Sequence, residues 1–251
     1  MHIIKAIFVN IYKRVLPKKK KVLKMETKKN FWQQILNIME LIISSYKARK
    51  GDPDAWESTI QKFEVQDQLH PPAKNSILFI GSSSINFWDT LAQDMSPLPI
   101  INRGFGGSYM RDMVKYLDRI VLPYQPRAIV LFAGTNDTTD NQPDTARQIF
   151  EGYTTFAQRV QAALPKIAIH YIAITPTPTR QKVWPIANEA NQLIQNYSQD
   201  NPNLHFVDFN HQLLNEDGKP NRSLYKFDGI HPNEKGYALW TAAIRPQLEK
   251  E

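Results

Sequence analysis

The chain has 251 residues, of which 42% are hydrophobic and 22% charged, and these values are ordinary for a soluble globular protein with one substantial domain. It contains no cysteine, which excludes disulfide bonds and thiolate metal sites. The formal charge of +7 is unevenly distributed, because residues 1–50 hold 13 Lys or Arg against 2 Asp or Glu, whereas residues 51–251 hold 18 against 22. The body of the chain is therefore mildly acidic, and we expect it to have no nucleic-acid partner.

Residues 1–30 are predicted to form a basic, flexible arm. Their lysine run, PKKKKVLK, is typical of a solvated tail and is also able to contact anionic lipid at a membrane surface. The apolar run at the start of the chain is interrupted by Asn10 and is shorter than the ~20 residues that a membrane span needs. No small-residue cleavage site follows it cleanly, so a secretion signal is only weakly indicated. We favour a cytoplasmic or membrane-peripheral location.

Residues 31–70 are predicted to form a helical extension that packs on the body. In residues 31–46, apolar side chains recur at helical spacing, with Gln, Asn, Glu and Ser on or near the opposite face. Such a helix packs on a domain or lies at an interface with a membrane or a partner, and we favour packing. The segment GDPDAWESTIQKFEVQD, residues 51–67, is predicted to follow as a second helix after a turn, and the prolines of HPPAKN end it. The remaining residues, 71–251, are predicted to form one domain.

Short apolar runs rich in Ile, Val and Phe recur along this domain and are predicted to be strands. They cover residues 76–80, 98–102, 128–133, 167–174 and 204–209. Helical patterns lie between or after them, near residues 108–121, 143–164, 185–199 and 234–248. Strands that are hydrophobic throughout and alternate with amphipathic helices are typical of a parallel sheet covered on both faces. The sequence therefore predicts an α/β fold, a three-layer α/β/α sandwich around a mainly parallel five-stranded sheet.

Five polar or glycine-rich segments follow the predicted strands. In chain order they are GSSSI, NRGFGGS, AGTND, TPTPTR and FDGIHPNEKG. In open parallel sheets, binding sites form beyond the carboxyl ends of the strands. We therefore expect the five segments to converge on one edge of the sheet.

The segment DGIHPN places Asp228 three residues before His231. In a loop, this spacing lets the carboxylate contact one ring nitrogen, so that the other nitrogen faces outward as a base with its tautomer fixed. An Asp-Gly turn beside a histidine that caps a helix is the structural alternative. A further alternative makes Asp228, His231 and Asp137 the metal ligands of a phosphoesterase. It is less favoured, because the acidic residues are not paired and a second histidine is missing from this edge.

Two other segments offer donors for a developing negative charge. Gly107, in NRGFGGS, allows close approach of a backbone N–H to a ligand, although the segment matches neither a dinucleotide fingerprint nor a phosphate loop. The alternative is a plain turn in which Ser108 caps the next helix. Asn136, in GTND, is able to donate through its side-chain amide, or else closes the strand as an Asx turn.

Together these segments resemble the sequence blocks of the SGNH hydrolases, also called GDSL-type esterases and lipases. FIGSSSI resembles the nucleophile block, NRGFGGS the glycine block, GTND the asparagine block and DGIHPN the Asp-His block. Their order and separations fit the family over about residues 76–245, whereas the G-x-S-x-G motif of another large hydrolase group is absent. The resemblance implies the flavodoxin-like SGNH fold for residues 71–251 and hydrolysis of carboxylic esters as the activity.

The resemblance also implies a role for each matching residue. The implied catalytic triad is Ser83, Asp228 and His231. The implied oxyanion hole is Ser83, Gly107 and Asn136. No metal and no organic cofactor are implied.

The register of the nucleophile block rests on a few residues. The family usually has Gly-Asp-Ser where this chain has Gly81, Ser82 and Ser83. The departure at Ser82 removes a carboxylate but not the nucleophile. Trp88 lies where some members also have a tryptophan, which favours Ser83 over Ser84 as the nucleophile.

The substrate is predicted only by class. Ser84, Thr177 and Trp184 are predicted to line the substrate site. No large insertion separates the blocks, which favours an open, shallow cleft and a small ester or a single-chain lipid such as a lysophospholipid. A carbohydrate acetylesterase or a thioesterase of the same fold is an alternative. A non-catalytic carbohydrate-binding relative is an alternative of another class.

Overall fold

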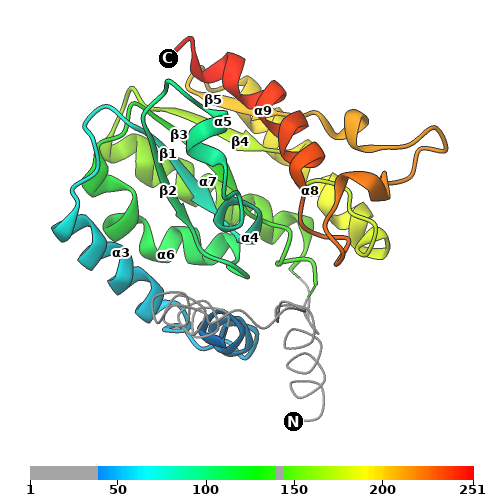
Figure 1. Ribbon diagram of the computed structural model, residues 1–251, viewed down its shortest axis with the longest axis horizontal. Coiled ribbons are helices and arrows are strands. Elements are labelled where there is room, and N and C mark those ends of the chain that lie inside the picture. The colour runs from blue at the N-terminus through cyan, green and yellow to red at the C-terminus, as the bar shows by residue number, and fades with distance from the viewer. Residues whose placement is uncertain (1–38, 140–143) are drawn as a thin grey trace, which may run out of the picture. The chain divides into compact units, whose positions relative to one another are not determined.

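In the computed structural model, the described residues are 39–139 and 144–251, and residues 43–251 form one compact unit in which strands and helices alternate (Figure 1). The strands are β1 (Ile77–Gly81), β2 (Ile100–Gly104), β3 (Ala128–Phe132), β4 (Ala168–Ile172) and β5 (Leu204–Val207). The helices include α3 (Glu57–Leu69), α4 (Ser83–Asn86), α5 (Leu91–Asp94), α6 (Met110–Ile120), α7 (Ala146–Ala163), α8 (Trp184–Gln199) and α9 (Glu234–Leu248). Short 3-10 helices are η1 (Leu122–Tyr124), η2 (Gln181–Val183), η3 (Asn210–Leu213) and η4 (Arg222–Leu224).

The strands form one parallel sheet in the order β2-β1-β3-β4-β5. Strands β1, β3 and β4 are buried along their whole length, which explains their continuous apolar sequences. After β1 the chain adds β2 on one side, and it then crosses to add β3 on the other side of β1. The carboxyl ends of β1 and β3 therefore lie side by side at a switch point, where ligands bind in folds of this type. The predicted fold class is confirmed.

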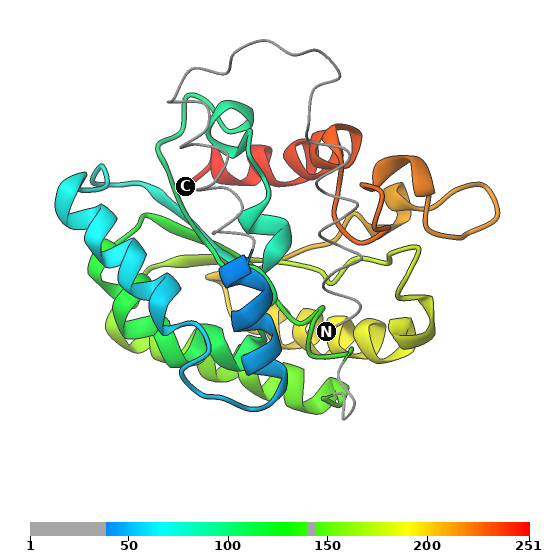
Figure 2. The same cartoon turned by 60° about the horizontal axis from the view of Figure 1, so that its bottom comes forward.

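Two layers of helices cover the sheet, with α9 on one face and α6, α7 and α8 on the other (Figure 2). On the α9 face, the ring centroids of Trp240 and Phe132 lie 4.8 Å apart, and Trp88 belongs to the same buried cluster. On the opposite face, Tyr153 of α7 meets Tyr171 of β4 at a centroid distance of 5.0 Å. Aromatic pairs of this kind contribute about 0.5–1.5 kcal/mol each beyond the area they bury.

Helix α3 and the turn before it pack against α6. Trp56 is fully buried and donates from Nε1 to Asp112 Oδ2 at 3.0 Å. Arg119 of α6 forms ion pairs with Glu57 and Glu64 of α3, each at 2.7 Å. A buried indole with a hydrogen-bonded N–H and a doubly paired guanidinium hold this segment on the body.

The N-terminal predictions have mixed outcomes. The predicted arm lies outside the described residues, and so does the first half of the helix predicted over residues 31–46; the described part of that helix covers residues 39–49. The second helix begins later than predicted, at Glu57, because Asp52 accepts the Asp54 N–H at 2.9 Å and holds a turn there. The boundaries of the arm and of the extension stay predictions. Within the described ranges, no helix combines the length and the apolar character needed to cross a membrane.

Candidate active site

The first site residue follows the end of β1. Gly81 closes this strand with φ of 151°, and a Cβ there would lie 2.1 Å from the carbonyl oxygen of Phe132 on β3. Only a glycine allows the two backbones to approach so closely. The chain then turns, and α4 begins at Ser83, on the carboxyl edge of the sheet. The close strand pairing thus brings Ser83 to the edge where the sequence predicted a site.

The Asp228–His231 loop meets Ser83 at this edge. His231 Nε2 lies 2.7 Å from Ser83 Oγ, and His231 Nδ1 lies 2.7 Å from Asp228 Oδ2. The other carboxylate oxygen, Oδ1, accepts the backbone N–H groups of Ile230 at 2.8 Å and His231 at 3.0 Å. The carboxylate is fixed by its own loop, so it holds the imidazole with Nε2 directed at the hydroxyl.

Burial and charge determine the protonation of this pair. Burial lowers the pKa of His231, the Asp228 carboxylate partly offsets this, and the cations Arg180 and Lys226 lower the pKa further. Burial acts to raise the pKa of Asp228, but hydrogen bonds from His231 and Ile230 outweigh it and leave that pKa below its ordinary value. At neutral pH the imidazole is therefore neutral and the carboxylate charged, which is the state that a general base requires.

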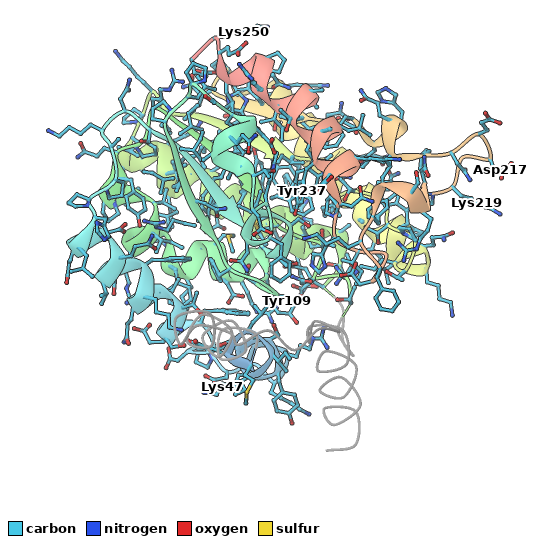
Figure 3. All side chains as sticks on the ribbon, viewed as in Figure 1. Lys47, Tyr109, Asp217, Lys219, Tyr237 and Lys250 are labelled. Atoms are coloured by element: carbon cyan, nitrogen blue, oxygen red, sulfur yellow. The ribbon has the colours of Figure 1, made fainter. Side chains whose placement is uncertain are left out.

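The neighbouring serine, Ser84, forms no hydrogen bond with His231 among the described residues. The Ser84 side chain is buried. The backbone carbonyl oxygen of Ser84 accepts a hydrogen bond from the hydroxyl of Tyr237 at 2.8 Å. Tyr237, which Figure 3 labels on α9, stacks on Trp88 with ring centroids 4.8 Å apart. Trp88 and Tyr237 thus lock the orientation of α4, and Ser83 is the serine that faces the imidazole.

Three groups at the same edge are suited to donate to an oxyanion. The backbone N–H groups of Ser83 and Gly107 donate to no other residue in the described part of the chain. Gly107 has φ of 83°, a left-handed conformation that favours glycine. Asn136 Nδ2 donates to the Ser108 carbonyl at 2.9 Å, so its second amide hydrogen is left for a ligand. The alternative that Ser108 caps the next helix is wrong, since the N-cap of α6 is Tyr109.

The two remaining residues predicted to line the substrate site are less closely connected to it. Thr177 is buried, and its hydroxyl has no hydrogen-bond partner among the described residues. Trp184 is the first residue of α8 and is partly buried. A role of either residue in substrate binding stays a prediction.

Arg180 is a residue of this edge that the sequence analysis missed. It ends the TPTPTR segment after β4; its Nη1 donates to the Thr135 carbonyl at 2.9 Å and its Nη2 to Asn136 Oδ1 at 3.2 Å. Because Ser108 binds the other end of the same amide, the orientation of Asn136 is fixed from both sides. The only signal in the sequence is an arginine in one of the five converging segments, which does not indicate that it folds onto GTND.

The ligands of the alternative phosphoesterase do not assemble into a metal site. Asp137 is buried, and its Oδ1 accepts the Met110 N–H at 2.9 Å. It forms no metal-binding group with Asp228 and His231. Among the described residues, the one group of His and acidic side chains close enough together to bind a metal lies around β4 and β5 and consists of His170, His205 and Glu251.

Several solved structures have the same fold as this chain. A Streptococcus pneumoniae protein described as a platelet activating factor is 21% identical, with a TM-score of 0.68 over 87% of this chain and 99% of its own. A GDSL-like lipase from Bacteroides thetaiotaomicron is 20% identical, with a TM-score of 0.65 over 76% and 97%. An acetyl-xylooligosaccharide esterase from a Geobacillus species is 16% identical, with a TM-score of 0.56 over 72% and 96%. At these identities the likeness is one of fold.

The sequence itself matches a family model. No curated protein is similar enough in sequence to match the chain. The model of the GDSL-like lipase/acylhydrolase family, in contrast, matches residues 79–239, which include all four sequence blocks. The resemblance drawn from those blocks is confirmed, and the chain belongs to the GDSL-like lipase/acylhydrolase family of ester-bond hydrolases.

Proposed function

We propose that the chain is a serine carboxylic-ester hydrolase with Ser83 as the nucleophile, His231 as the general base and acid, and Asp228 as the residue that orients the imidazole. The main support is the continuous path from Asp228 through His231 to Ser83, in which both contacts measure 2.7 Å. These contacts join three residue types in the order that acyl transfer to water uses.

In the first half of the reaction, Ser83 Oγ attacks the carbonyl carbon of the ester while its proton passes to His231 Nε2. The tetrahedral intermediate collapses, the bond to the leaving alcohol breaks, and His231 returns the proton to that alcohol. In the second half, His231 removes a proton from water, the hydroxide attacks the acyl-enzyme, and Ser83 regains its proton as the acid leaves. Asp228 stays ionised and stabilises the imidazolium.

The negative charge that develops on the carbonyl oxygen needs donors fixed in advance. We assign this role to the N–H groups of Ser83 and Gly107 and to the free amide hydrogen of Asn136. Removal of one such donor typically lowers turnover by about 10²–10³-fold. We therefore expect Asn136→Ala to lower kcat by this factor while the affinity for substrate changes less.

Two phenylalanines at the edge of the site favour an acyl chain as part of the substrate. The ring of Phe87 packs edge-on against His231, with centroids 5.0 Å apart. Phe227, directly before Asp228, is 84% exposed. An apolar ring in contact with the proposed base, as Phe87 is, can pack against part of an ester's hydrocarbon. We propose a short-chain acyl ester or a single-chain lipid as the substrate, with acetylated oligosaccharide as the second candidate.

Labelling by a fluorophosphonate probe tests the nucleophile. We expect the wild-type chain and Ser84→Ala to be labelled and active, and Ser83→Ala to lose both properties. Labelling of Ser83→Ala, or loss of labelling in Ser84→Ala alone, would refute the assignment. A panel of p-nitrophenyl esters of increasing chain length, together with acetyl-xylan and lysophosphatidylcholine, distinguishes the substrate classes.

A further inference from the structure

Arg180 is held against the segment that carries Asn136. Its two hydrogen bonds go to the Thr135 carbonyl at 2.9 Å and to Asn136 Oδ1 at 3.2 Å. A guanidinium has five N–H donors, so three remain without a partner in the described part of the chain. Arg180 is half-buried, so part of it is exposed to solvent.

The loop before Arg180 is also tied to the Asp228–His231 loop. Thr179 donates through its hydroxyl to the Gly229 carbonyl at 3.0 Å, and its backbone N–H reaches the same oxygen at 3.4 Å. The loop that carries Arg180 is thus held at the Asp228–His231 loop, while its guanidinium binds the segment that carries Asn136.

The charge of Arg180 is not neutralised by an ion pair. Within residues 39–139 and 144–251, no carboxylate lies within 4.0 Å of its guanidinium. By contrast, Arg103 is paired with Asp67 and Arg119 with two glutamates. A partly desolvated cation without a counter-ion is unfavourable unless a ligand supplies the negative charge.

A second arginine increases this positive charge. Arg49 is exposed and, like Arg180, forms no ion pair within the described ranges. Burial lowers the pKa of Arg180 to about 10, and the nearby charge of Arg49 contributes to this, partly offset by Asp228. A guanidinium without a counter-ion beside a reaction site is suited to bind an anionic group.

We propose that Arg180 forms an anion subsite, which binds a carboxylate or phosphate group carried by the ester substrate. The inference rests on the proposed ester hydrolysis at Ser83 and adds a substrate class to it, esters with a negatively charged group near the reacting carbonyl. The guanidinium of Arg180 binds this group through its unused donors, while its bond to Asn136 keeps the amide in place.

Matched ester pairs test the subsite and show which part of the substrate carries the charge. On the acyl side the pair is the p-nitrophenyl monoester of adipic acid against p-nitrophenyl hexanoate. On the alcohol side it is p-acetoxybenzoate against p-acetoxybenzamide. We expect the wild type to prefer the charged member of one pair in kcat/KM. Arg180→Gln should lower kcat/KM for that member by about 10- to 100-fold and for its neutral partner much less.

Three further variants complete the design. Arg180→Lys keeps the positive charge but not the planar guanidinium with its paired N–H donors, so we expect an intermediate loss of the preference for the charged ester. Arg49→Gln should reduce the preference less, because this side chain is exposed. Arg147→Gln, on the exposed surface of α7, should leave the preference unchanged. Thermal melts of each variant show whether the fold is retained.

Two results would overturn the subsite. One is a wild type that hydrolyses the charged and neutral members of both pairs equally well. The other is an Arg180→Gln variant that loses the same factor on both members, since a residue that only positions Asn136 would act in this way. Failure of the proposed function is distinct, because it would appear as ester hydrolysis that persists in Ser83→Ala or as no hydrolysis of any ester.

Discussion

At the scale of single residues, Lys226 is a cation whose charge opposes protonation of His231. Its ammonium lies over the ring of Phe87, 5.5 Å from the centroid. The proposed base must be neutral to act, so kcat/KM falls as the pH drops through the pKa of His231. Lys226→Gln removes the opposing charge and raises that pKa. We therefore expect the acid limb of the kcat/KM profile to move to higher pH, with little change on the plateau.

The profile is measured with a neutral p-nitrophenyl ester, from about pH 4.5 to the plateau near pH 8. Lys226→Arg is the matched control, because it keeps the charge and should keep the limb in place. If the acid limb of the kcat/KM profile of Lys226→Gln coincides with that of the wild type or moves to lower pH, the electrostatic account of His231 is contradicted.

The residues of the candidate site differ in how far the sequence could predict them. Ser83 and Asn136 stand in short blocks soon after β1 and β3, and a parallel sheet brings such positions to one edge. His231 is separated from β5 by η3 and η4, and its place at this edge was predicted from the Asp-His block. Arg180 also follows a strand, but its contact with Asn136 depends on the path of a proline-containing loop. Hydrophobic periodicity carries no information about such a path, so this part of the site required the three-dimensional structure.

At the scale of elements, the helix that ends at residue 49 packs against the glycine segment between β2 and α6. Ser45 Oγ donates to the Gly106 carbonyl at 3.4 Å, and a Cβ on Gly107 would lie 2.4 Å from Ser45 Oγ. In Gly107→Ala, the new Cβ is therefore placed on a left-handed backbone and collides with Ser45 Oγ. We expect it to lower the free energy of unfolding by about 2–4 kcal/mol, of which the backbone accounts for about 1–2 kcal/mol.

Urea denaturation measures this loss, and two variants divide it into its parts. Gly218→Ala has the same left-handed requirement, with φ of 71°, but nothing lies within 4 Å of its Cβ, so only the backbone part should appear. In a Ser45→Gly background the collision is removed. There, Gly107→Ala should lower the free energy of unfolding by about as much as Gly218→Ala does. Equal losses for Gly107→Ala and Gly218→Ala in the wild-type background would rule out the contact with this helix.

The elements themselves were predicted unequally well. Strands β1, β3 and β4 are buried on both faces, so their sequences are apolar throughout and easy to recognise. The start of α3 was predicted too early, because the turn held by Asp52 occupies the first part of the predicted segment and the apolar pattern does not show where this turn ends. Ser108 was considered as an alternative cap of α6 because serine is a common N-cap, whereas Tyr109 occupies that position.

At the scale of the whole molecule, one buried carboxyl makes the free energy of unfolding depend on pH. Asp137 is 2% exposed, and its Oδ2 has no hydrogen-bond partner within the described ranges. Burial raises the pKa of Asp137 to about 7, although the Met110 N–H partly opposes this. In the unfolded chain the same group has a pKa of about 4. Between these two values the folded state holds more protons, so the free energy of unfolding falls as the pH rises.

Asp137→Asn removes the titrating proton and keeps an oxygen that is able to accept the Met110 N–H. The free energy of unfolding of the variant should therefore increase relative to that of the wild type from about pH 4 to about pH 7. Above pH 7 the difference gained should stay constant at about 2–4 kcal/mol. Urea denaturation across this range measures it. Asp217→Asn, at the tip of a loop that stands out from the body in Figure 3, should follow the wild-type curve. Parallel curves for wild type and Asp137→Asn would mean that Asp137 is already ionised in the folded state at low pH, and that water or a neighbouring cation compensates its burial.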